Sequence, residues 1–112
     1  MIRRNLLTSV LDLMDGSSQI LIDFNNRAEK IFFPLYEKFK ESAKLLDRAR
    51  DDNVFQQQQS KYVQTLKQQL ESLALEILNK NSSVGNNSQL NRKLTEEINE
   101  YLKEFRQKSR SL

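Results

Sequence analysis

The sequence predicts an all-α fold, an elongated antiparallel helical bundle of three to four helices, and three observations support this. The 112 residues include only two glycines and one proline, whereas strands joined by tight turns need more of both. The most frequent residues, among them Leu, Gln, Lys and Glu, suit a helix or its solvent-facing side. Apolar residues recur every three or four positions, which is the helical period. At this length, residues 1–112 are expected to form a single helical-bundle domain.

The first predicted helix is the longest and covers about residues 4–50. Its apolar residues follow one another at a mean spacing of about 3.6 positions, the α-helical period. The phase is kept through residues 15–18 and through Pro34, either of which could break a helix. We therefore predict one helix that is kinked near Pro34, and an interruption at residues 15–18 stays open. The residues of this stripe are Leu6, Val10, Leu13, Ser17, Ile20, Phe24, Ala28, Ile31, Leu35, Phe39, Ala43, Leu46 and Ala49.

Two shorter helices are predicted at residues 54–80 and 88–109. Asn53 is a candidate N-cap for the first of them, with Gln56 in the reciprocal position of a capping box. A loop rich in Ser, Asn and Gly separates the two, and the tail 109–112 is expected to fray. The apolar stripes are Phe55, Tyr62, Leu66, Leu70, Leu73 and Ile77 in one helix and Leu90, Leu94, Ile98, Leu102 and Phe105 in the other.

Helix length limits how these elements can pack. At 1.5 Å per residue the first helix would span roughly 65–70 Å, against about 40 Å and 33 Å for the others. A simple three-helix bundle would leave much of the first helix uncovered. There are two ways to cover it. The first helix either breaks near Gly16 and folds back to give four helices, or stays long and is covered by a second copy of the chain.

Four apolar residues lie off the stripes and are the candidate partner or dimer interface. Leu11, Ile22 and Phe33 are 11 residues apart, which is three helical turns, so they align with one another. On the second helix, Leu75 follows Leu66 by nine residues, about half a turn away in angle, so it also lies off its stripe. Aligned apolar side chains on a long helix are typical of a contact surface. The alternative is that the first helix is central and buried on both sides.

The composition argues against an enzyme. Histidine and cysteine are absent, which removes the commonest general base, the commonest nucleophile–base pairs and the usual zinc ligand sets. We expect no cofactor and no metal. The densest carboxylate cluster lies off the apolar stripe, and we interpret it as a solvated face. Its members are Glu96, Glu97, Glu100 and Glu104.

Charge gives no signature of nucleic-acid binding. The net charge is +3, from 18 basic and 15 acidic residues that are mixed along the chain. Arg3, Arg4, Arg106, Lys108 and Arg110 could form a small basic patch only if the two ends meet. Nucleic acid is therefore not an expected partner. No segment approaches the roughly 20 apolar residues of a membrane span, and a cytoplasmic location is expected.

These observations predict a non-enzymatic helical protein–protein interaction module. We expect a homodimeric adaptor, assembly subunit or regulatory subunit, because unused apolar surface on long helices suits a second copy or another helical protein. One alternative is a small all-α secretion or assembly chaperone that holds a partner helix in a groove. Another is a nucleic-acid-associated regulator.

Overall fold

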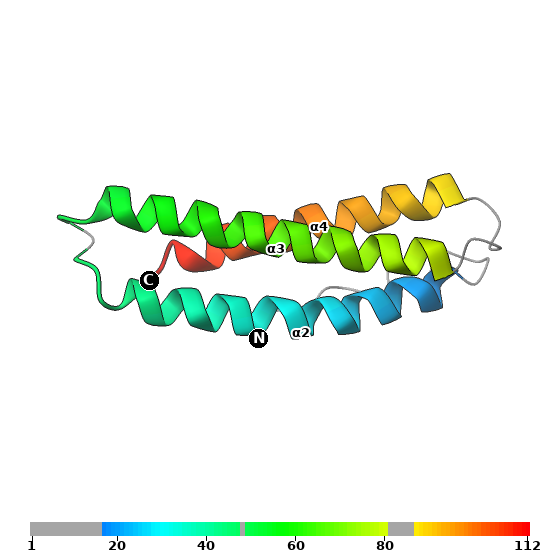
Figure 1. Ribbon diagram of the computed structural model, residues 1–112, viewed down its shortest axis with the longest axis horizontal. Coiled ribbons are helices and arrows are strands. Elements are labelled where there is room, and N and C mark those ends of the chain that lie inside the picture. The colour runs from blue at the N-terminus through cyan, green and yellow to red at the C-terminus, as the bar shows by residue number, and fades with distance from the viewer. Residues whose placement is uncertain (1–16, 48, 81–86) are drawn as a thin grey trace.

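The computed structural model describes residues 17–47, 49–80 and 87–112, and within these ranges it contains three α-helices and no strand. The helices are α2 (Ser17–Ala43), α3 (Asp52–Lys80) and α4 (Asn87–Ser109). The predicted all-α class is confirmed. The three helices lie side by side, and α3 runs antiparallel to both α2 and α4 (Figure 1). The longest dimension of the molecule is 52 Å.

The buried side of α2 is rotated from the predicted stripe. Ile20, Ile31 and Leu35, which the spacing placed at its centre, are only half-buried at its edge. The reason is that α2 packs against both α3 and α4, so its buried side faces the space between them. Its buried apolar residues are Leu21, Phe24, Ala28, Phe32, Tyr36, Phe39 and Ala43. The helix runs through Pro34, whose side chain is exposed.

Helix α2 ends at Ala43, well before the predicted end near residue 50. The amides of Leu45 and Leu46 bond three residues back, to the carbonyls of Ser42 and Ala43. Asp47 and Asp51 then offer side-chain oxygens to the backbone. The Asp47 carboxylate accepts the Ala49 N–H at 3.0 Å, and the Asp51 carboxylate accepts the Asp47 N–H at 3.0 Å. Such local bonds compete with helix formation, which the apolar spacing of Leu46 and Ala49 did not reveal.

The other two helices end at Lys80 and Ser109 as predicted, but they begin one or two residues earlier than predicted, and the contacts at their ends differ. Asn53 lies inside the first turn of α3 and does not cap it; Gln56 instead donates to the Asp52 carboxylate at 2.8 Å. The tail was expected to fray from Ser109, and this was wrong. Ser109 is fully buried, its hydroxyl accepts from Gln59 of α3 and donates to the Arg106 carbonyl, and Leu112 packs against the core.

Aromatic rings hold the three helices together where α2 and α4 end and α3 begins. The ring of Phe105 on α4 lies 5.7 Å from Phe32 and 5.7 Å from Phe39 on α2. Phe39 in turn lies 5.3 Å from Phe55 and 5.4 Å from Tyr62 on α3. Rings at these separations stabilise the fold beyond the area they bury. None of the described helices is both long and apolar enough to cross a membrane.

Candidate partner-binding groove

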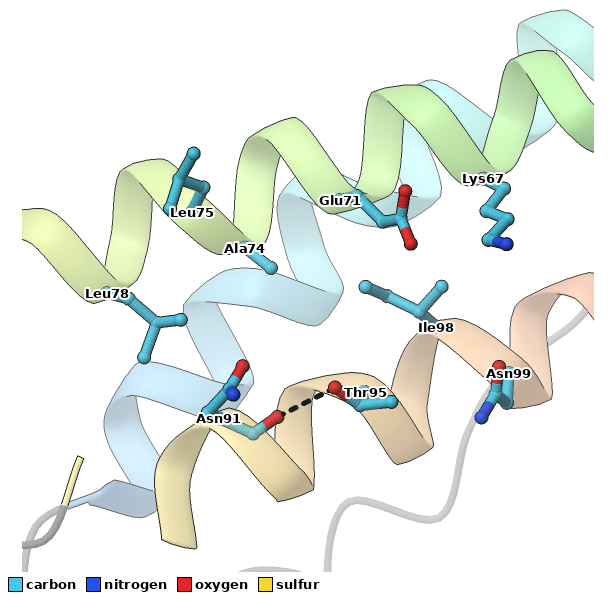
Figure 2. A pocket seen from close by; sticks show the side chains of 9 residues that line it. All are labelled: Lys67, Glu71, Ala74, Leu75, Leu78, Asn91, Thr95, Ile98 and Asn99. Atoms are coloured by element: carbon cyan, nitrogen blue, oxygen red, sulfur yellow. Dashed lines mark hydrogen bonds between the residues drawn. The ribbon is translucent and has the colours of Figure 1, made fainter. Parts of the chain in front are cut away.

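A groove of 310 Å³ runs between α3 and α4, and its floor is apolar. Ala74, Leu75 and Leu78 come from α3, and Ile98 comes from α4 (Figure 2). Ala74 and Ile98 belong to the buried core, and Leu78 packs against it. Leu75 points away from the core and is 59% exposed. The groove is therefore a continuation of the core that reaches the surface.

The rim of the groove is polar and carries both signs of charge. Lys67 and Glu71 stand one helical turn apart on α3, and Asn91, Thr95 and Asn99 line the opposite side on α4. The Thr95 hydroxyl donates to the Asn91 carbonyl at 3.0 Å, so it is bonded within its own helix. An apolar floor inside a polar rim is the usual anatomy of a protein-binding site.

Leu75 differs from the other large hydrophobic side chains that the structure exposes. Leu45 is 86% exposed but lies in the turn after α2, and Val54 is 42% exposed in the first turn of α3. Neither lines a groove with the core residues that surround Leu75. Single exposed apolar residues are common on protein surfaces, whereas a contiguous apolar patch marks a contact.

Of the four residues that the sequence grouped as an interface, the structure places Leu75 on a different surface from Phe33. Leu75 lines the α3–α4 groove, while Phe33 lines a more open hollow on α2 with Glu29 and Lys30. Phe33 is half-buried, with its ring edge-on to Phe32 at 5.6 Å. Ile22 is also half-buried. Leu11 lies outside the described residues.

A buried polar cluster between α2 and α4 was missed by the sequence analysis. The Asn25 side-chain amide donates to the Leu21 carbonyl at 2.9 Å and to the Glu97 carboxylate at 3.0 Å. The Tyr101 hydroxyl donates to the Asn25 side-chain oxygen at 2.7 Å. Glu97 is 7% exposed, so its assignment to a solvated face was wrong. Helix α4 packs against two neighbours and therefore buries a wider side than its leucine stripe indicates.

The basic residues considered for nucleic acid do not form one surface in the described part of the chain. Lys108 is half-buried and its amine lies 5.3 Å from the centre of the Tyr36 ring. Arg106 and Arg110 are exposed and line a shallow hollow on α4 with Lys103. Arg3 and Arg4 lie outside the described residues. A cation over an aromatic ring is a packing interaction, so Lys108 contributes to the fold.

Among the described residues, no group of three or more acidic side chains is placed to hold a metal ion. Comparison with protein-family models, with curated proteins and with solved structures finds no match to this chain. The groove and the chemistry of the residues that line it are therefore the features of this chain that point to a function.

Proposed function

We propose that this chain is a non-enzymatic protein–protein interaction module that forms a homodimer through the α3–α4 groove. The observation that carries the proposal is the exposure of Leu75 beside Ala74, Leu78 and Ile98. Covering such a side chain on association removes apolar surface from water, worth about 25 cal/mol per Å². The dimer would serve as an adaptor, assembly subunit or regulatory subunit.

The charges on the rim favour a second copy as the occupant. Lys67 and Glu71 are exposed, and no ion pair of the described residues involves either. A two-fold axis brings the same surface of both copies together. Lys67 can then face the partner's Glu71 while Glu71 faces the partner's Lys67. The remaining rim residues are neutral, so two copies of this surface meet without net repulsion.

The first test is the mass of the protein in solution over a range of concentrations. Light scattering or sedimentation equilibrium should give twice the 13.2 kDa of one chain at high concentration and one chain at low concentration. Leu75→Glu should raise the dimer dissociation constant by roughly 30-fold or more, the effect of losing a central apolar contact of about 2 kcal/mol. Helical circular dichroism should be unchanged, because Leu75 is outside the core.

The matched control is Leu45→Glu, the same substitution at an exposed leucine in the turn after α2. It should leave the dimer dissociation constant within about twofold of wild type, since surface changes away from a contact have small effects. A wild-type chain that stays at the mass of one chain at every concentration overturns the homodimer. So does an equal loss of dimer in the two variants.

The architecture that we propose for the whole chain is an antiparallel bundle of three to four helices, with α2 bent near Pro34. Pro34 supplies the physical reason for the bend, because it has no N–H to offer the Lys30 carbonyl and its ring crowds that carbonyl. The α2–α4 face is where a further helix can be added, since two of its side chains, Ile22 and Phe33, are apolar and only half-buried.

A further inference from the structure

A second groove lies between α2 and α3, near the end of the bundle where α2 ends and α3 begins. It has a volume of 390 Å³ and is lined by three residues of α2 and four of α3. This volume is at the lower end of the range for small-ligand sites, about 300–1,000 Å³. The groove shares no lining residue with the α3–α4 groove, so it is a separate surface from the proposed dimer interface.

The register of the two helices places a lysine on each side of this groove. Helices α2 and α3 run antiparallel (Figure 1), and Arg27 of α2 pairs with Glu76 of α3. Eleven residues further along α2 and eleven residues back along α3, Lys38 comes level with Thr65. Lys61 lies one turn before Thr65, which is about 6 Å along the helix. Both lysines line the groove, and both are exposed.

No carboxylate lines the groove to balance these two positive charges. Residues 53–70 of α3 include two lysines and no acidic residue. On α2, Glu37 is next to Lys38 in the chain and therefore faces another side, and Glu41 bonds Lys44 at 3.3 Å. The carboxylates of the turn after α2 bond the backbone of that turn. Neither lysine of the groove is in an ion pair among the described residues, so the groove attracts anions.

The uncharged residues of the groove add hydrogen-bond donors. Ser42 and Tyr62 have hydroxyls that bond no other described residue. The Thr65 hydroxyl donates to the Lys61 carbonyl at 3.0 Å and is used within its own helix. The Gln58 side-chain oxygen is buried and has no hydrogen-bond partner within the described ranges. Because no bond among these residues holds the Gln58 amide, it can turn its N–H groups toward a ligand, which also relieves the cost of an unpaired buried oxygen.

We propose that this groove binds an organic phosphate monoester. Such a group carries close to two negative charges at pH 7, which match the two ammonium groups, and its oxygens accept hydrogen bonds from the surrounding donors. A carboxylate would supply one charge and fewer acceptors. Leu35 and the ring of Tyr62 are half-buried beside the two lysines, so they offer apolar surface to the organic part of the ligand.

The other cationic hollow of the described chain does not have this geometry. It is lined by Lys103, Arg106 and Arg110, and all of its lining residues belong to α4. No second helix approaches a ligand there from the opposite side. This hollow is therefore an internal comparison, because it has more positive charge than the α2–α3 groove without the opposed pair of lysines.

Nuclear magnetic resonance of the nitrogen-15-labelled full-length chain, titrated with phenyl phosphate at pH 7.5 and constant ionic strength, tests the proposal. Amide signals of residues 35–42 and 58–65 should shift and saturate with a dissociation constant on the order of 1 mM. Acetate should bind at least about tenfold more weakly, since it has one charge. Lys38→Gln and Lys61→Gln should each raise the dissociation constant roughly tenfold, the effect of losing one hydrogen bond from a charged donor.

The matched control is Lys103→Gln, which removes the same charge from the α4 hollow. It should leave the dissociation constant within about twofold of wild type. Leu75→Glu should bind phenyl phosphate as wild type does, whether or not the proposed dimer forms, so the two proposals fail separately. A peptide with a phosphoserine separates two sources of the phosphate. If it binds more tightly than phenyl phosphate, the ligand is a side chain of a partner protein; if it binds more weakly, the ligand is a free small molecule.

Three results would overturn the proposal. The first is the absence of saturable shifts at about 20 times the expected dissociation constant. The second is a set of shifts centred on the α4 hollow, or an equal loss of affinity in Lys103→Gln and the two groove variants. The third is an equal affinity for acetate, which would show that the lysines attract any anion without a site for phosphate.

Discussion

At the scale of single residues, the Asn25–Glu97–Tyr101 cluster is the most specific contact between α2 and α4. Apolar side chains tolerate sliding, but a side-chain amide that bonds a carboxylate and a hydroxyl fixes the register of the two helices. Asn25 is 2% exposed, so these bonds lie away from water. Losing these buried hydrogen bonds lowers the free energy of unfolding more than losing a hydrogen bond at the surface does.

Asn25→Ala should therefore lower the free energy of unfolding by about 2–4 kcal/mol, since it takes away one hydrogen bond from each of two buried groups. Urea unfolding measures this directly. Asn26→Ala is the matched control, because Asn26 is the next residue and is exposed; a change within about 0.5 kcal/mol is expected. Equal effects at the two positions would show that the buried bonds do not stabilise the fold.

At the scale of helices, periodicity predicted the existence of the elements and missed features that depend on neighbours. The stripes of α3 and α4 were visible because each repeats apolar residues at helical spacing, three of them leucines in each helix. The end of α2 at Ala43 was not visible in the sequence. Leu46 and Ala49 continue the apolar spacing, although aspartate side chains bond the backbone there. The burial of Glu97 depends on Asn25, 72 residues away. The sequence indicated Leu75 as a candidate because it is apolar and lies off the stripe. The groove that it lines could not be predicted, because four of its nine lining residues come from α4.

Pro34 gives a prediction at this scale. It is exposed within α2, where an alanine would add an N–H for the Lys30 carbonyl. Pro34→Ala should raise the free energy of unfolding by on the order of 1–2 kcal/mol, because the helical gain exceeds the extra freedom of the unfolded chain. Thermal and urea unfolding would measure it. A decrease in the free energy of unfolding would mean that a bend at Pro34 stabilises the packing of α2 by more than the added hydrogen bond to the Lys30 carbonyl does.

At the scale of the whole molecule, the α3–α4 groove and the aromatic end lie in different parts of the bundle. Phe105, Phe39 and Phe55 join α4, α2 and α3 at one end, and the polar cluster aligns α2 with α4. Tyr36 of α2 contacts the last turn of α4: its hydroxyl donates to the Lys108 carbonyl at 3.3 Å and its ring lies under the Lys108 amine. The α3–α4 groove, which we propose as the dimer interface, lies along one side of this framework.

Tyr36 makes the stability of the whole fold sensitive to alkaline pH. Burial, and then the negative charge of Glu37, raise the pKa of Tyr36 above its usual value of 10.0. The folded chain therefore keeps this proton at a pH where the unfolded chain has lost it. Its contribution to stability is complete below pH 10 and decreases as pH rises above that value. A phenolate could no longer donate to the Lys108 carbonyl.

Tyr36→Phe isolates this effect, because lysine titration is common to both proteins. The free energy of unfolding, measured in urea at half-unit steps from pH 8 to pH 11.5, should be lower in the variant at pH 8, where the bond to Lys108 is missing. Above pH 10 the wild type should lose stability more steeply, so that the difference between the two proteins narrows. Parallel curves over the whole range would mean that the proton on Tyr36 is not linked to folding.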